Sequence, residues 1–503
     1  MHTVLILGDQ LHREIASLAG ASPDDTRILF VVSRTKLANK AWHRQRLHTV
    51  LAGMRRMAIQ LEAEGFAVDW RVAPTFAQGI ESHRNDHRTA NDPTTLVAMA
   101  PMSFGARALL RRLGVEQVAN TQFLCSEDEF TSWAAVRKGR LRMEDFYRWQ
   151  RARLGYLMEP DGAPSGGRWN FDAENREPPP RDGRTWPQPD CVATDSVDDE
   201  IASMISTLAP QAFGRPYDGL WPTTRAHALT RLSRVVREVL PAFGPHEDAM
   251  MADNWHLAHT LLSSSLNLGL VTPKEVCDAA ADAHRAGLLP IASAEGFIRQ
   301  VIGWREYVWG LYWLWGPQYA TENALGATRP LPDAFRGGAT RMRCVATCVA
   351  DLERNAFNHH IQRLMVLGNL ALLAGVAPAE MTDWMWASFV DGAEWVMVPN
   401  VVGMSLHADG GRMATKPYAG GGSYISKMSD YCKGCAFDPK KRTGPAACPF
   451  TSLYWDFLAR HEDRFRANNR MFNQMASLRR LADLPATRAR AEEVLRALDV
   501  GEL

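Results

Sequence analysis

Three cysteines near the C-terminal end of the sequence have the spacing of a metal or cluster site. They follow the pattern Cys432-x2-Cys435-x12-Cys448 in a chain of 503 residues. A tight turn at Lys433 and Gly434 would bring the first two sulfurs together, and the third cysteine closes the loop. Three thiolates leave one ligand position open, so the pattern predicts a fourth cysteine from another part of the chain.

Two further cysteines, Cys344 and Cys348, are the candidates for that fourth ligand. Four thiolates suit either zinc or an iron–sulfur cluster. Pro449 follows the last cysteine of the run, and a proline in this place recurs in ferredoxin-like motifs, which favours a cluster. The alternative is a group of buried free cysteines. A disulfide framework is not expected in a large chain that lacks a secretory signal.

The adjacent histidines His359 and His360 lie in a stretch, residues 342–375, that is predicted to be helical. Neighbouring residues of a helix point about 100° apart, so we do not expect the pair to share a metal. His360 falls on a largely apolar stripe with Phe357 and Leu364. This placement would draw its imidazole into an interior, where its pKa depends on its neighbours. The alternative is a core histidine without a chemical role.

Three other segments have compositions that suit ligand binding. Residues 302–315 hold four tryptophans and two tyrosines beside Arg305, and such a segment can stack on bases or a planar cofactor, or fill a core. Residues 260–267 cluster hydroxyl groups at a helix start, where phosphate can bind, although ordinary capping also explains them. Residues 418–424 form a glycine loop with a tyrosine at each end, which could shape a pocket or form a simple turn.

The elements that must position these residues fall into two classes. The first part of the chain alternates predicted strands and helices, at residues 4–7, 28–32, 47–61, 66–72, 106–113 and 115–118. Later helices are predicted at residues 256–270, 294–315, 342–375 and 452–468. The fold class is therefore a Rossmann-like α/β domain with a parallel sheet (residues 1–135), followed by a larger all-α domain (residues 217–503). Between them, residues 136–216 form a proline-rich linker with an aromatic insert at residues 168–176.

Composition limits the classes of partner and location. The net charge is +1, so a phosphate backbone would have to be held by a local basic surface. No run of about 18 apolar residues occurs, and the first residues resemble a strand, not a signal peptide, so we expect a cytoplasmic protein without a membrane span. The glycine fingerprints of common dinucleotide and triphosphate sites are missing.

Taken together, several motifs resemble the photolyase/cryptochrome family, most closely its bacterial iron–sulfur branch, whose characterised repair members act on (6-4) photoproducts. The motifs that carry the resemblance, in chain order, are LILGDQL (residues 5–11), GRLRMEDFY (139–147), GRWNFDAENR (167–176), GWREY (303–307), HHIQRLM (359–365) and the cysteine run. They span nearly the whole chain. The resemblance implies an N-terminal antenna domain, a long interdomain loop that approaches DNA, and a helical FAD-binding domain.

The resemblance also implies cofactors and the residues that hold them. A [4Fe-4S] cluster would be bound by Cys344, Cys432, Cys435 and Cys448, so the resemblance selects Cys344 over Cys348. FAD would be contacted by His259, Thr260, Ser263, Ser264, Arg363, Asn369, Asp391, Met397 and Asn400. The resemblance further allows a 6,7-dimethyl-8-ribityllumazine antenna.

The implied activity is light-driven electron transfer from reduced FAD to a photoproduct flipped out of UV-damaged DNA. His360 would donate a proton to the lesion, with His359 beside it, because a radical anion in a dry pocket must be neutralised before the electron returns. The implied substrate-binding residues are Leu364, Met404, Tyr418, Tyr424, Asp172 and Arg176. The protein would act as a monomer, associated with the nucleoid when bound to DNA.

Four positions depart from the family pattern. Arg336 and Met385 stand where the family has a tryptophan and a tyrosine of its electron relay, next to Phe335 and Trp384. Trp384 would remain in the relay, and Tyr431, Trp386 or Trp395 could replace the missing members. Met397 replaces a glutamate near the flavin N5 atom. Residues 33–36 (SRTK) lack the acidic residue of the lumazine-antenna pattern.

Two functions compete on these residues. The first is a (6-4) photolyase, favoured by the histidine pair and by the residues of the interdomain loop. The second is a blue-light receptor of the same fold without repair activity, favoured by the altered relay. A zinc-stabilised nucleic-acid-binding protein without flavin is a third alternative.

Overall fold

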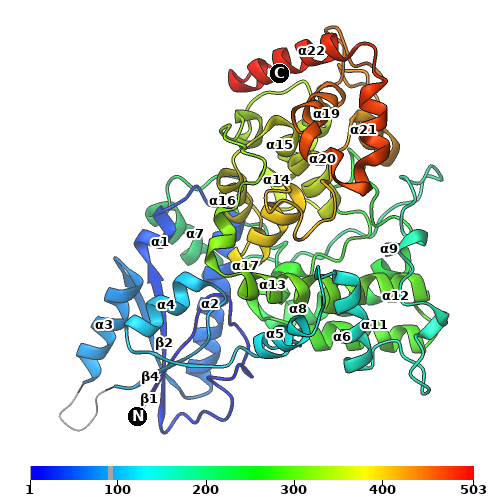
Figure 1. Cartoon of the computed structure of the whole chain (residues 1–503). Helices are drawn as coiled ribbons and strands as arrows, with labels where there is room; N and C mark the ends of the chain where they lie inside the picture. The colour runs from blue at the N-terminus through cyan, green and yellow to red at the C-terminus, as the bar shows by residue number, and fades with distance from the viewer. Residues whose placement is uncertain (1, 89–93) are drawn as a thin grey trace.

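The computed structural model describes residues 2–88 and 94–503 (Figure 1). Its five named strands form one parallel sheet with the order β3-β2-β1-β4-β5. The strands are β1 His2–Leu5, β2 Thr26–Ser33, β3 Ala67–Ala73, β4 Leu96–Met99 and β5 Glu116–Val118. In the central pairings, Val4 lies opposite Ile28 of β2 and Val97 of β4. The predicted parallel sheet is thus confirmed.

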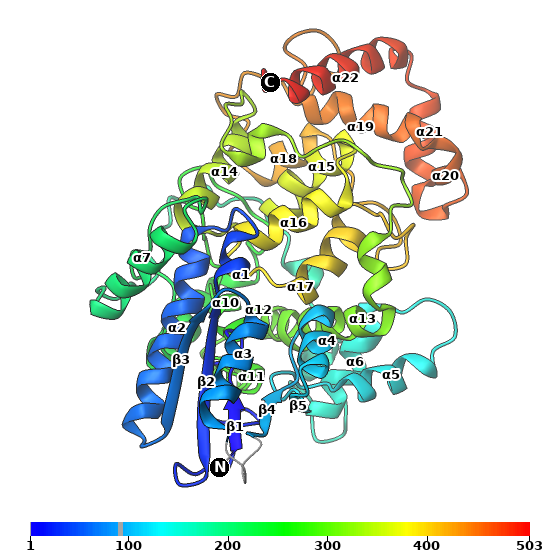
Figure 2. The ribbon, with the colours of Figure 1, turned by 90° about the vertical axis from the view of Figure 1, so that its left-hand side faces the viewer.

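Helices connect and cover these strands, as parallel pairing requires. They are α1 Arg34–Ala38, α2 Arg44–Ala63, α3 Phe76–His87 and α4 Phe104–Arg112, whereas α5 Glu127–Ala135 follows the last strand and packs against the helical part. Successive strand residues point to opposite faces, so Val4 packs with Leu51 of α2, whereas Leu5 packs with Ile80 of α3 and Leu110 of α4. Figure 2 shows α2 on one side of the sheet and α3 on the other. The helices predicted at residues 47–61 and 106–113 are confirmed as α2 and α4.

The remainder of the described chain is almost entirely helical, which confirms the predicted fold class. Its α-helices are α6 Met143–Leu154, α7 Ser196–Leu208, α8 Arg225–Arg234, α9 Leu240–Phe243, α10 Ser263–Leu268, α11 Pro273–Arg285, α12 Ile291–Ile298, α13 Glu306–Trp315, α14 Arg343–Asn355, α15 Asn369–Ala374, α16 Pro378–Ser388, α17 Glu394–Val398, α18 Gly422–Met428, α19 Pro449–Arg460, α20 Glu462–Arg466, α21 Phe472–Arg479 and α22 Leu484–Asp499. Four π-helical segments adjoin them, Val235–Val239, Arg299–Arg305, Gln362–Gly368 and Pro399–Ser405. Short 3-10 turns lie at Ser165–Gly167, Asp172–Glu174, Pro317–Thr321, Asp333–Arg336 and Asn469–Met471.

Three of the predicted helices are interrupted. The stretch 452–468 divides at His461 into α19 and α20. In the stretch 342–375, Ala356 adopts the left-handed conformation with φ 54° and ends α14. Residues 357–359 are not helical, and the chain becomes helical again at His360. In the stretch 256–270, only α10 is an α-helix, and Leu257 and Leu261 have positive φ. Apolar periodicity does not reveal such breaks because the flanking helices keep the same spacing of buried residues.

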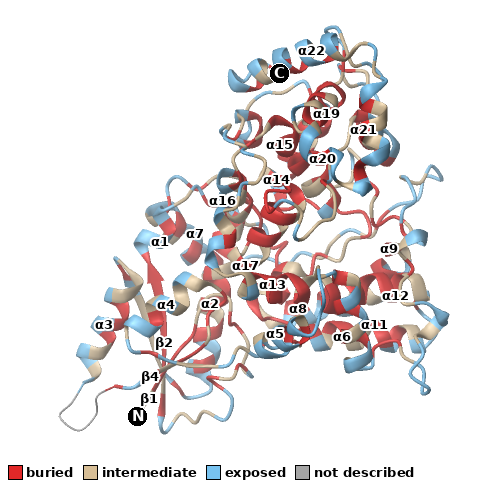
Figure 3. Ribbon diagram, viewed as in Figure 1, coloured by how far each residue is buried: buried red, intermediate tan, exposed pale blue. Residues whose placement is uncertain are grey.

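Buried residues occur both in the sheet and throughout the helical part (Figure 3). One hydrophobic cluster joins the α2 face of the sheet to α11 and α12, and a second lies around α13, α14 and α19. The two parts of the chain are therefore packed against each other and not merely tethered. Among the described residues, no helix is long and apolar enough to cross a membrane.

The segment 136–216, predicted to be a linker, contains α6 and α7 and is anchored to the helical part. Phe171 is buried, and its N–H donates to Glu295 at 2.9 Å. The buried Arg151 guanidinium donates to the carbonyl of Trp169 at 2.9 Å. These contacts fix the aromatic insert over α12. The domain limits at residues 135 and 216 stay predictions.

Candidate active site and cysteine cavity

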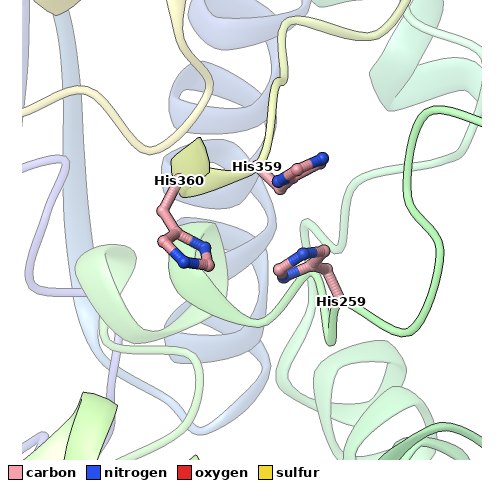
Figure 4. Close-up of side chains that lie close together, drawn as sticks. All are labelled: His259, His359 and His360. Carbon is pink, nitrogen blue, oxygen red and sulfur yellow. The ribbon is translucent and has the colours of Figure 1, made fainter. Parts of the chain in front are cut away.

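Three histidines from two segments form the centre of the candidate site (Figure 4). The rings of His259 and His359 stack with centroids 4.4 Å apart and planes 11° apart. The His360 ring meets His259 edge-on at 5.4 Å. One donor nitrogen from each of the three lies within 4.8 Å of the others. Contrary to the sequence-based expectation, the two adjacent histidines are thus close enough to bind one common group.

The burial of His360 also differs from the prediction. His359 is 2% exposed, and neither of its ring nitrogens has a hydrogen-bond partner among the described residues. The His360 side chain is 46% exposed. The prediction placed His360 on a buried helical stripe, but the break at Ala356 leaves His359 outside the helix and changes the direction of both rings. Burial lowers the pKa of His359 well below its usual value, so this imidazole is neutral.

Asp248 is the charged partner of His360. Its Oδ1 atom lies 3.3 Å from Nε2 of His360. Partial burial lowers the pKa of His360, but the hydrogen bond to Asp248 and the charges of Asp248 and Glu247 outweigh this effect, so the pKa is raised. Burial also raises the pKa of Glu247 to about 7. His360 is therefore the member of the cluster that can carry a proton near neutral pH.

Two predicted substrate-binding tyrosines, Tyr418 and Tyr424, feel the charge of Asp248. Partial burial raises the pKa of Tyr418 and brings that of Tyr424 to about 12, and the charges of Arg176 and Asp248 act on both hydroxyls. Tyr418 is 39% exposed, and Arg176 pairs with Asp172 on the surface. Tyr418, Tyr424 and Arg176 thus lie within electrostatic range of Asp248.

The other predicted substrate contacts lie on three separate segments. Asp172 also accepts from the buried Arg299 at 3.2 Å, so it anchors the interdomain loop. Leu364 and Met404 are partly buried on the segments Gln362–Gly368 and Pro399–Ser405, which pack against each other. No contact of Leu364 or Met404 with the tyrosines is given by the described geometry.

Residues predicted to contact FAD converge on Asp391. The Ser263 hydroxyl donates to Asp391 Oδ2 at 2.7 Å, and the Arg363 guanidinium donates to both carboxylate oxygens at 2.9 and 3.2 Å. Asn267, which the sequence did not single out, donates to the main-chain oxygen of Asp391 at 2.9 Å. This cluster joins α10, the segment Gln362–Gly368 and the loop after α16.

The remaining predicted FAD residues do not join that cluster directly. Asn369 exchanges two hydrogen bonds with Gly420, so it fixes the glycine loop. The Asn400 amide donates to the Val396 carbonyl of its own helix, and Met397 is buried. Thr260 is partly buried ahead of α10, and the buried Ser264 hydroxyl has no partner among the described residues.

The four cysteines predicted to bind a cluster line one cavity. Cys344 reaches it from α14, and Cys432, Cys435 and Cys448 reach it from the loop before α19. Cys348 is buried one turn further along α14 and does not line the cavity. The predicted turn is present, since the Cys435 N–H donates to the Cys432 carbonyl and Gly434 has φ 74°, a value that favours glycine.

Comparison with known proteins agrees with this geometry. Residues 4–221 match the family described as "Deoxyribodipyrimidine photo-lyase-related protein". The curated "(6-4) photolyase" of Agrobacterium fabrum is 39% identical over 507 residues, which cover 99% of both chains. The chain belongs to the photolyase/cryptochrome family.

Solved structures of this family share the fold. A bacterial class III photolyase from Agrobacterium tumefaciens superposes with a TM-score of 0.56 at 16% identity, over 99% of this chain and 97% of that one. A Synechocystis cryptochrome gives a TM-score of 0.51 at 13% identity, over 80% and 82% of the two chains. At these identities the likeness shows the fold alone.

The electron-relay positions of the photolyase/cryptochrome pattern can be located in the structure. Trp384 lies between Phe335 and Phe389, with ring centroids 5.2 and 6.0 Å away. Arg336 is exposed, whereas Met385, which follows Trp384 in sequence, is buried in the core. Neither side chain at these two positions can be oxidised in the way that tryptophan or tyrosine can.

Three aromatic side chains were predicted as replacements in the relay. Tyr431 is fully buried, lines the cysteine cavity and accepts a hydrogen bond from Gln362 at 3.0 Å. By contrast, Lys36 and Lys40 lie 4.7 and 5.1 Å from the Trp386 ring. Their charges oppose formation of a tryptophan radical cation at Trp386. Arg305, 5.4 Å from Trp395, opposes oxidation there in the same way.

Asp248, Glu247 and Asn267 are the site residues that sequence reasoning missed. The acidic pair at 247–248 has no motif around it, and its role comes only from contact with a histidine more than a hundred residues away. Asn267 lies four residues after Ser263, one helical turn along the predicted hydroxyl segment. That spacing was the one signal that could have identified it.

Proposed function

We propose that this protein repairs (6-4) photoproducts in UV-damaged DNA with the energy of blue light. The observation that carries the proposal is the Asp248–His360 pair, a charge-stabilised imidazole at a partly open position, with Tyr418, Tyr424 and Arg176 within electrostatic range of Asp248. The full-length relative from Agrobacterium carries the name of this activity. Such an enzyme would work as a monomer in the cytoplasm on a flipped lesion.

FAD is the flavin that the family implies, and the chain has groups that fit it. Ser264 and His259 keep buried polar atoms without partners among the described residues, and the partly buried Arg363–Asp391 pair presents fixed charges beside them. We assign phosphate contacts to Thr260, Ser263 and Ser264, and contacts to the ring system to Arg363, Asn369 and Asp391. When bound and reduced, FAD supplies the electron after excitation by light.

The side chains of the site then have separate tasks. His360 holds a proton on its imidazole, and Asp248 keeps it there. The neutral His359 packs against His259 and fixes the floor of the site. Tyr418 and Tyr424 provide aromatic surface and hydroxyl groups for a flipped base. Arg176 is exposed, so its guanidinium can approach a phosphate of the DNA backbone.

An iron–sulfur cluster is the better assignment for the cysteine cavity than zinc. Tetrahedral zinc with bonds of about 2.3 Å requires sulfurs about 3.8 Å apart. Among the described residues, no three of these thiol sulfurs lie within 4.8 Å of one another. The wider arrangement suits a cluster with several metal atoms, held by Cys344, Cys432, Cys435 and Cys448.

A lumazine antenna would bind where the carboxyl ends of β1 and β2 meet, as ligands do in open parallel sheets. Ser33 caps α1 there through the Lys36 N–H, and Asp9 follows β1. The antenna site would therefore have the carboxyl group of Asp9 but none from residues 33–36, and no step of repair depends on it.

A second candidate function, that of a light receptor without repair, is favoured by Arg336 and Met385. One experiment separates the two functions. Purified protein is given an oligonucleotide with a defined (6-4) lesion, and another with a cyclobutane dimer, under blue light and in darkness. We expect repair of the (6-4) lesion in light only. Absence of repair by protein with reduced FAD would contradict the proposal. The function of a light receptor without repair would then remain.

A further inference from the structure

Arg46 belongs to α2 of the sheet domain but makes its hydrogen bonds to the helical domain. Its Nε donates to the carbonyl of Trp386 at 3.1 Å, and its Nη2 donates to the carbonyl of Gly392 at 2.5 Å. One planar guanidinium thus joins the two ends of the loop that contains Asp391. Two bonds from a rigid fork fix both the position and the orientation of that loop.

The backbone conformation of this loop is tightly restricted. A Cβ atom on Gly392 would lie 2.4 Å from the Trp386 carbonyl oxygen, so the two ends of the loop approach each other closely. Between them, Asp391 accepts hydrogen bonds from Ser263 and Arg363. The position of this carboxylate therefore depends on a loop that Arg46 closes.

The surroundings of Arg46 keep it in this place. Its guanidinium lies 4.9 Å from the Trp42 ring, and that ring packs edge-on against Trp386 at 5.9 Å. The charge of Arg46 also faces the carboxyl groups of Asp391 and Asp9. Asp9 lies at the edge of the sheet, and burial raises its pKa to about 6. Arg46 thus stands between a carboxyl group of the sheet edge and the carboxyl group of the proposed flavin site.

We propose that Arg46 is a positioning residue of the flavin site, so that the sheet domain controls how tightly the helical domain retains FAD. This inference rests on the proposed function, because it takes the Asp391 cluster to be part of the FAD site. Loss of the guanidinium would free the loop, weaken the hold of Asp391 on Arg363 and Ser263, and speed the release of FAD.

The test measures the rate at which the diluted holoprotein releases FAD, followed by the rise in flavin fluorescence. We expect Arg46→Ala to release FAD about 10- to 100-fold faster than wild type, the effect of losing two hydrogen bonds from a charged donor. Arg46→Lys, which keeps the charge and one donor, should release it at an intermediate rate. If Arg46→Ala does not fold, the rate of FAD release from Arg46→Lys, compared with that of wild type, decides whether the inference holds.

Arg44→Ala is the matched control. Arg44 lies on the same helix and donates to the carbonyl of Gly214, away from the Asp391 loop. Its substitution should leave FAD release unchanged. Equal release from Arg46→Ala and wild type, or equal acceleration in Arg44→Ala, would overturn the inference. Wild-type protein without any flavin would instead overturn the proposed function on which the inference rests.

Discussion

Asp248 Oδ1 lies 3.3 Å from Nε2 of His360. Because the pKa of His360 is raised in the folded protein, the pair stabilises the fold at pH values below the usual pKa of histidine. That stabilisation is lost as the pH rises through the raised value. The same protonation equilibrium would set the upper pH limit of repair.

Replacement of Asp248 by asparagine tests this coupling. The amide cannot stabilise the imidazolium by charge, so the pKa of His360 should fall and repair should decline at a lower pH than in wild type. The measurement is the rate of (6-4) repair against pH under constant blue light. Asp253→Asn changes an exposed carboxylate five residues along the chain and should keep the wild-type profile. Identical profiles for all three proteins would show that Asp248 does not control His360.

The cysteine cavity makes a separate prediction. Anaerobically purified protein should contain about four iron and four sulfide per chain. Cys435→Ala should lose the broad brown absorption and most of its soluble yield, because a bound cluster ties the surrounding helices together. Cys348→Ala, whose sulfur does not line the cavity, should keep both. Stoichiometric zinc in the fresh protein would contradict the cluster.

The altered relay predicts slow photoreduction of oxidised FAD. The double variant Arg336→Trp with Met385→Tyr restores two oxidisable side chains next to Phe335 and Trp384, so it should photoreduce faster than wild type. The reaction is followed as the loss of oxidised-flavin absorbance under blue light in the presence of a thiol reductant. Equal rates would mean that another electron-transfer route already reduces FAD. Tyr431→Phe would then test whether that route passes through Tyr431.

The periodic parts of the fold could be predicted from the sequence, and the irregular parts could not. Four of the five named strands follow from short apolar runs, and helix α2 follows from the helical spacing of apolar residues, as at Leu47 and Leu51. Strand β4 was not predicted. The helix predicted through residues 342–375 was wrong at Ala356, because a single left-handed residue leaves the apolar spacing on both sides unchanged.

The residues of the candidate site likewise divide into those that the sequence could predict and those that it could not. The cysteine pattern placed Cys432, Cys435 and Cys448 together because their spacing is local. The Asp248–His360 contact joins distant segments, and only the folded chain reveals it. The exposed position of His360 was missed for the same reason, since its direction depends on the break that precedes it.

The most direct test of the proposed function is repair by His360→Ala. This variant should keep FAD and the cluster and still bind damaged DNA. Loss of a general acid typically costs about 10²- to 10⁴-fold, and return of the electron competes here with protonation, so repair of the (6-4) lesion should be nearly abolished. His360→Asn should behave in the same way, and His359→Ala should lose less. A wild-type quantum yield of (6-4) repair in His360→Ala would show that the residue donates no proton and that the proposed mechanism is wrong.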